Sequence, residues 1–213
     1  MESDFTDTVR QMPETRCVVF DLGNVLIEWD RRLLFEKLIT DGEQLQDFLD
    51  NVFTMEDNRI LDSGTPVHEV AAAVALRHPD KRDLVTAFAD RWSETLGDVI
   101  EGTVEILGDL HSAGVPVYAL SNWGRDTFAM IEPNYPFLQL FDGMVISGRE
   151  GVTKPDAAIF QILCDRYDIL PQNAVFIDDS SANVAAAMIM GFDALLFERA
   201  DRLRQQLVER SLL

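Results

Sequence analysis

Polar residues that could do chemistry follow the apolar, strand-like runs of this chain. They comprise three carboxylates, one lysine and a serine-asparagine pair: Asp21, Asp178, Asp179, Lys154, Ser121 and Asn122. Two adjacent carboxylates such as Asp178 and Asp179 repel each other unless they share a cation, so this pair predicts a metal site. A metal cation next to a lysine and a serine hydroxyl would suit a reaction on an anionic substrate.

Alternating strands and helices are expected to position these residues. Buried strands are predicted for five β-branched or aliphatic runs, at residues 17–20, 115–120, 143–146, 173–177 and 193–197. Helical patterns separate the later runs, at residues 104–114, 156–167 and 182–191. This alternation predicts an α/β fold with a parallel sheet covered on both faces. Ligands of such sheets bind beyond the carboxyl ends of the strands, which is where the polar residues fall.

One interval breaks the alternation and predicts an inserted helical segment. Residues 31–98 contain no good strand but several amphipathic stretches, for example residues 67–76 and 81–92. We expect this insertion to form a small helical cap over the strand ends, like a lid. The core would then comprise residues 16–30 and 99–213, preceded by a polar leader at residues 1–15.

Composition narrows the classes of partner. The chain has 213 residues and a formal net charge of 18 − 37 = −19, which would repel a nucleic-acid backbone. No run approaches the 18 consecutive apolar residues that a membrane span needs, so no membrane association is expected. The two cysteines, Cys17 and Cys164, lie in apolar or helical patterns and are typical of core residues in a reducing, cytoplasmic compartment. The oligomeric state stays open.

Four motifs in order give the chain its resemblance to a known family. They are VVFDLGNV (18–25), ALSN (119–122), GVTKPD (151–156) and VFIDDSSAN (175–183). Over roughly residues 16 to 200 the sequence resembles the haloacid dehalogenase-like hydrolase superfamily. The resemblance implies a Rossmann-like, three-layer α/β/α core with an inserted helical cap, and a small-molecule phosphate ester as the substrate.

The resemblance also implies roles for the polar residues. Asp21 would be the nucleophile that attacks phosphorus and forms an aspartyl-phosphate. Lys154 would supply positive charge to the phosphoryl group, and Ser121 and Asn122 would bind its oxygens. The alternative from the residues alone is that Asp21 only begins a turn at the Gly-Asn step, as hairpin signals do.

Mg²⁺ is the cofactor that the resemblance implies, because it prefers oxygen ligands. Its expected protein ligands are Asp21, the backbone carbonyl of Gly23 and Asp179, with Asp178 in direct or indirect contact. The alternative for the two adjacent aspartates is that they cap the helix that follows.

The sequence departs from the family at Gly23. Most phosphatases of the family carry there an aspartate that acts as general acid and base, which is typically worth 10²–10⁴-fold in rate. One branch resembles this chain in its Asp-Leu-Gly-Asn-Val motif and includes phosphatases of sugar phosphates such as glucose 1-phosphate. Glu28, Asp30 or a cap carboxylate such as Glu56 could replace the missing acid.

The expected function is therefore a Mg²⁺-dependent phosphatase of small phosphorylated metabolites. Alternatives are a non-catalytic binding or regulatory protein, a phosphotransferase, and a 2-haloacid dehalogenase, which would not need the acidic pair. Trp29, Asp30 and Trp123 are candidates for lining a substrate pocket. The histidines lie away from the strand ends and are expected to be non-catalytic: His68, His78 and His111.

Overall fold

A five-stranded parallel sheet forms the centre of the computed structural model, which describes residues 16–213. The strand order is β5-β4-β1-β6-β7. The bounds are β1 (Cys17–Phe20), β4 (Val117–Ser121), β5 (Gly143–Ile146), β6 (Ala174–Asp178) and β7 (Asp193–Leu196). All five predicted strands are therefore present, and the α/β fold class is confirmed. The predicted polar leader, residues 1–15, lies outside the described residues.

The central strand β1 shows why the sheet needs helices on both faces. All its residues are buried, and alternate side chains join different apolar clusters. Val18 and Phe20 pack on one face, whereas Cys17 and Val19 pack on the other. Because β1 has no solvent-exposed face, its sequence is a continuous apolar run rather than an alternating one. Cys17 and Cys164 are both free and buried, as expected of core residues.

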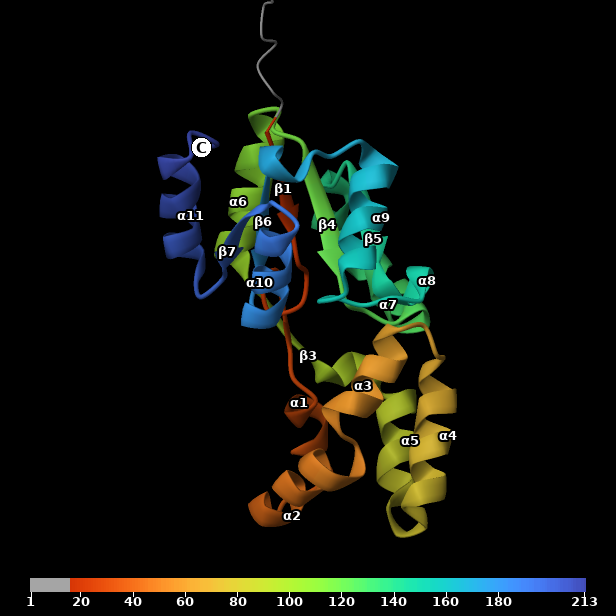
Figure 1. Cartoon of the computed structure of the whole chain (residues 1–213). Coiled ribbons are helices and arrows are strands. Elements are labelled where there is room, and N and C mark those ends of the chain that lie inside the picture. The colour runs from red at the N-terminus through yellow and green to blue at the C-terminus, as the bar shows by residue number, and fades with distance from the viewer. Residues whose placement is uncertain (1–15) are drawn as a thin grey trace, which may run out of the picture.

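Helices cover both faces and complete the three layers (Figure 1). Helices α6 and α11 contribute apolar side chains to the cluster of Phe20, and α9 and α10 contribute to the cluster of Val19. The bounds of the helices after β3 are α6 (Glu101–Ser112), α7 (Arg125–Ile131), α8 (Ser147–Glu150), α9 (Ala157–Tyr167), α10 (Ser181–Ile189) and α11 (Ala200–Glu209).

The segment between β1 and β4 is largely helical, as predicted. Its helices are α1 (Arg32–Phe35), α2 (Gly42–Asp47), α3 (Met55–Asp62), α4 (Val67–Arg77) and α5 (Arg82–Asp90), with a π-helical turn at Phe48–Val52. A group of close phenylalanine rings holds them together, including Phe53 and Phe88 with ring centroids 4.2 Å apart. Figure 1 shows this helical insertion beyond the carboxyl ends of the strands.

Two expectations about the ends of the insertion need correction. Residues 31–98 were expected to hold no strand, but β3 (Leu96–Val99) begins within them and pairs antiparallel with β2 (Ile27–Trp29). The Gly-Asn step does form a turn, with Asn24 at φ 54°, but β2 pairs with β3 and not with β1. The physical reason is that the chain leaves and re-enters the core at one place, so the two crossing segments pair with each other. Among residues 16–213, no helix combines the length and the apolar character needed to cross a membrane.

Candidate active site

The ends of three adjacent strands place the first group of polar residues together. Asp21 directly follows β1, and Ser121 and Asp178 are the last residues of the neighbouring strands β4 and β6. The Ser121 hydroxyl donates a hydrogen bond of 2.7 Å to Asp21 Oδ1. Both side chains are almost fully buried, at 1% and 7% exposure. The strand order that the apolar runs create therefore brings these residues into contact.

Lys154 reaches the same point from the loop that follows α8. Its Nζ lies 3.0 Å from Asp21 Oδ2 and 2.6 Å from Asp178 Oδ2, and it also donates to the Leu120 carbonyl oxygen at 2.8 Å. The Asn122 side chain fixes this loop, because its amide group donates to the Lys154 carbonyl and accepts from the Lys154 backbone N–H. Lys154 is buried, so its ammonium group interacts with Asp21 and Asp178 rather than with solvent.

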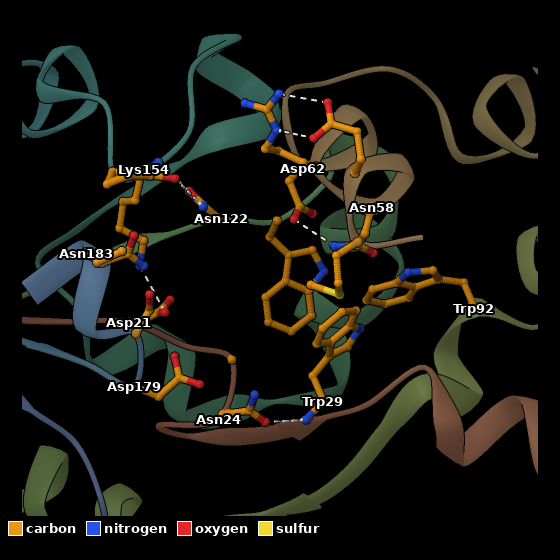
Figure 2. Close-up of a pocket in the computed structure, with 18 residues that line it drawn as sticks. Asp21, Asn24, Trp29, Asn58, Asp62, Trp92, Asn122, Lys154, Asp179 and Asn183 are labelled. Carbon is orange, nitrogen blue, oxygen red and sulfur yellow. Dashed lines mark hydrogen bonds and ion pairs between the residues drawn. The ribbon is translucent and has the colours of Figure 1, made fainter. Parts of the chain in front are cut away.

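Asp178 and Asp179 have different surroundings although they are adjacent. Asp178 is fully buried, and its Oδ1 accepts hydrogen bonds from the Ser180 backbone N–H at 2.8 Å and from Asn183 Nδ2 at 2.9 Å. Asp179 is exposed, and it lies beside Asn24 at the edge of the cavity (Figure 2). Asp178 is therefore held by the protein, whereas Asp179 is free to bind something else.

The three carboxylates form a group with excess negative charge. Asp21, Asp178 and Asp179 each offer an oxygen within 4.8 Å of the others. Burial raises the pKa of Asp21 to about 7; Lys154 opposes this shift, and the neighbouring aspartates reinforce it. Burial alone would lower the pKa of Lys154, but the carboxylates of Asp21 and Asp178 outweigh it. The pKa of Lys154 is therefore raised, and the lysine stays protonated. One lysine thus faces three acidic groups, and this set of oxygen donors fits a hard divalent cation.

A cavity of about 500 Å³ opens above these groups, between the strand ends and the helical insertion. Trp29 and Trp123 line it, as predicted, and Trp92 of the insertion joins them, with the rings of Trp92 and Trp123 5.8 Å apart. Asp30 is outside the lining, contrary to expectation, because its carboxylate accepts from the Arg32 backbone N–H at the start of α1. None of the three histidines lines this cavity.

Sequence reasoning missed several lining residues, among them Asn58 and Asp62. Asn58 and Asp62 lie on α3 and project into the cavity, where Asn58 Nδ2 donates to Asp62 Oδ2 at 2.9 Å (Figure 2). Burial raises the pKa of Asp62 to about 7, and the Asp21 carboxylate adds to the shift. A capping box of Thr54 and Asp57 starts α3, and that Thr-x-x-Asp spacing was the available sequence signal.

The carboxylates suggested as replacements for the missing acid have other contacts. Glu28 does not line the cavity. Glu56 does, but both its oxygens are bound by Arg59, at 2.8 and 2.9 Å. Gly23 itself lines the cavity, and a Cβ added there would meet no atom within 4 Å. The space for a side chain at position 23 is therefore present although the side chain is not.

Similar proteins are found among curated sequences. A sesquiterpene phosphatase, astK, of Aspergillus oryzae is 25% identical over 196 residues, which are 84% of this chain and 88% of the relative. Drimenol cyclase drtB of Aspergillus calidoustus is 27% identical over 204 residues. That match covers 90% of this chain, but the chain spans only 36% of the length of drtB.

Solved structures share the fold. A haloacid dehalogenase family enzyme from Bacteroides thetaiotaomicron, in complex with magnesium and inorganic phosphate, superposes with a TM-score of 0.64. The match covers 86% of this chain and 94% of that enzyme at 24% sequence identity. The model of the haloacid dehalogenase-like hydrolases matches residues 15–191, which include all the strand-end residues except those of β7. The chain therefore belongs to the haloacid dehalogenase-like hydrolase family.

Proposed function

We propose that this protein is a Mg²⁺-dependent phosphatase that hydrolyses a small phosphate ester through an aspartyl-phosphate on Asp21. The observation that carries the proposal is the contact of one buried carboxylate with both a lysine and a serine hydroxyl beneath a cavity. The relative astK, a sesquiterpene phosphatase, supports the same reaction class.

The residues of the chain have distinct parts in this reaction. Asp21 Oδ attacks phosphorus and the bond to the ester oxygen breaks, which replaces one difficult displacement by two easier ones. Lys154 balances the charge of Asp21 and of the transferring group, and Ser121 Oγ can turn from Asp21 to a phosphoryl oxygen. Asn122 positions Lys154 through its backbone and has one amide N–H left for the phosphate.

The acidic group would hold the Mg²⁺ ion. Its proposed protein ligands are Asp21, Asp179 and the carbonyl oxygen of Gly23, with Asp178 behind them as the partner of Lys154. The ion supplies positive charge that cancels the repulsion between a carboxylate nucleophile and a phosphate. We propose residues 31–98 as the cap that covers this site, on a core of residues 16–30 and 99–213.

The lining of the cavity bears on the substrate. Indole faces can pack against a sugar ring or an apolar chain, so the tryptophans alone do not distinguish these classes. Three buried polar atoms of lining residues have no hydrogen-bond partner among the described residues: Asn58 Oδ1, Trp92 Nε1 and Trp123 Nε1. A buried polar atom without a partner is costly, so a substrate would gain if its hydroxyl groups reached these atoms through a shift of the three side chains. A sugar phosphate such as glucose 1-phosphate meets that requirement.

Phosphate release from a panel of esters tests the proposal. Sugar phosphates, terpenyl phosphates and p-nitrophenyl phosphate are incubated with the protein, with Mg²⁺ or with EDTA. We expect release that needs Mg²⁺, is fastest for a sugar phosphate and is abolished in Asp21→Asn, whose fold is checked by circular dichroism. Release that persists in Asp21→Asn would contradict the role of Asp21. Phosphoryl transfer to an added alcohol without hydrolysis would identify a phosphotransferase, and binding without either reaction would identify a regulatory protein.

A further inference from the structure

The reaction needs a proton at a position where this chain has no side chain. When the bond between phosphorus and the ester oxygen breaks, an alkoxide leaves unless an acid protonates it. Gly23 cannot supply the proton, so another group in the cavity must. The carboxylates that line the cavity within residues 16–213 are Asp21, Glu56, Asp62 and Asp179.

Three of these carboxylates are unsuited to the task. Asp21 is the proposed nucleophile, and Asp179 belongs to the acidic group that fits a cation. Glu56 is held by the guanidinium of Arg59 through both oxygens, and this contact lowers its pKa, so it stays ionised. Asp62 remains.

Asp62 has the position and the contacts of a proton donor. Among the described residues its side-chain hydrogen-bond partner is the amide of Asn58, rather than a cation. Figure 2 shows Asp62 and Asp21 on opposite sides of the cavity, so a phosphate ester between them would have the nucleophile on one side and Asp62 on the other. Asp62 belongs to helix α3 of the insertion, whereas Asp21 follows strand β1 of the sheet.

The structure also fixes Asp62 relative to the strand ends, although it belongs to the insertion. The Asp62 carbonyl oxygen accepts a hydrogen bond of 2.6 Å from Ser147 Oγ. The same hydroxyl accepts from the Trp123 backbone N–H at 2.9 Å, directly after the ALSN motif. Gly64 packs closely on this region, because a Cβ there would lie 2.8 Å from the Gly148 carbonyl oxygen. Asp62 is therefore anchored to the loop that follows β4 and to α8, which follows β5.

We propose that Asp62 is the general acid and base of this enzyme, in place of the aspartate that Gly23 lacks; the inference rests on the proposed phosphatase function. In the first step the Asp62 carboxyl proton passes to the ester oxygen as its bond to phosphorus breaks, and the alcohol leaves. In the second step the Asp62 carboxylate takes a proton from water. The water oxygen bonds to phosphorus, the bond from phosphorus to Asp21 breaks, and inorganic phosphate is released. Asp62 ends protonated again, so the cycle balances.

The environment of Asp62 suits both steps. Burial and the Asp21 carboxylate raise its pKa, while Asn58, Lys154 and the Gly124 backbone oppose the shift. An acid is most effective when its pKa lies near the working pH, because the donor and acceptor forms are then both accessible.

The dependence of the rate on the leaving group tests the proposal. Alkyl phosphates need a proton on the departing oxygen, whereas p-nitrophenyl phosphate releases a stabilised anion that does not. In Asp62→Asn, which keeps the size of the side chain, we expect kcat for the preferred alkyl ester to fall by about 10²–10⁴-fold. The rate of the first step with p-nitrophenyl phosphate, measured as the nitrophenol burst, should fall far less. Asp62→Ala should show the same selectivity if Asp62→Asn folds poorly.

Two further variants sharpen the test. Glu56→Gln, the matched change of a lining carboxylate on the same helix, should leave the ratio of alkyl to aryl rates unchanged. Adding Gly23→Asp to Asp62→Asn should restore part of the alkyl-ester rate, because position 23 has room for the side chain. Equal loss on both ester types, or no loss on either, would overturn the role of Asp62 while the phosphatase function stands. A wild-type protein that releases no phosphate from any ester would overturn both.

Discussion

At the scale of single residues, the adjacent aspartates illustrate how one dipeptide serves two tasks. Asp178 is fully buried and bonds to Lys154, Ser180 and Asn183. Asp179 is exposed and turned toward the cavity. Neutralising Asp178 should therefore affect stability, and neutralising Asp179 should affect metal binding.

For Asp178→Asn we expect a large loss of stability. The new amide would place an N–H donor or a weaker acceptor against the Lys154 ammonium, which is buried and would lose half of its ionic partners. Breaking a buried ion pair by removing one partner costs about 3–5 kcal/mol. Urea unfolding of the variant and the wild type measures the difference. A change below about 1 kcal/mol, the range of exposed ion pairs, would contradict the structural role.

For Asp179→Asn we expect the opposite pattern. Within residues 16–213 the exposed carboxylate has no ion pair to lose, so the free energy of unfolding without metal should change little. If Asp179 is a ligand of Mg²⁺, the Mg²⁺ concentration that gives half-maximal phosphate release should rise steeply. Titration of activity against Mg²⁺, with unfolding measured in EDTA as the control, separates the two effects. An unchanged Mg²⁺ requirement would remove Asp179 from the ligand set.

At the scale of elements, the strands were predictable and helix α3 was not. Buried parallel strands are continuous apolar runs, so β1, β4 and β6 stand out, and the residues that follow them must meet at one edge of the sheet. The contact of Asp21 with Ser121 follows from that rule, whereas Lys154 reaches Asp21 from the loop that follows α8. The segment of α3 is mostly polar, and its apolar positions are too few for a helical pattern. Asp62 opens the stretch DSGTP (62–66), which is typical of a loop, so its approach to the strand ends depends on tertiary packing.

The start of α3 offers a prediction at this scale. Thr54 caps the helix, because its hydroxyl accepts from the Asp57 backbone N–H and the Asp57 carboxylate accepts from the Thr54 backbone N–H. We expect Thr54→Ala to cost about 1 kcal/mol of stability. If Asp62 acts as proposed, loosening α3 should also slow the turnover of alkyl phosphates. Thr54→Ser keeps the hydroxyl and is the matched control.

Thermal unfolding and phosphate release, measured on both Thr54 variants, check this prediction. A Thr54→Ala protein as stable as wild type would show that the capping box contributes nothing to the helix. A destabilised protein with full activity on alkyl esters would show that α3 holds Asp62 in place without its first turn, through the Ser147 hydrogen bond at the other end.

At the scale of the whole molecule, the protein carries a charge of the same sign as its proposed substrate, so the two repel each other at long range. The net charge is −19, and a phosphate ester is also negative at neutral pH. Local positive charge at the site attracts the phosphoryl group at short range, but approach from solvent occurs against the field of the whole protein. The acidic surface would also concentrate Mg²⁺, so the two ions respond to the same field in opposite directions.

Added salt should therefore accelerate capture of the substrate. The screening length falls from about 30 Å at 0.01 M ionic strength to about 8 Å at 0.15 M, so long-range repulsion is largely removed while contacts inside the buried site are little changed. With Mg²⁺ held at saturation, we expect kcat/KM for an anionic ester to rise as KCl is added over this range, and kcat to stay nearly constant. Steady-state kinetics at several KCl concentrations measure both. A fall in kcat/KM would mean that local positive charge outweighs the field of the whole molecule even at a distance, so that substrate is steered toward the site rather than repelled.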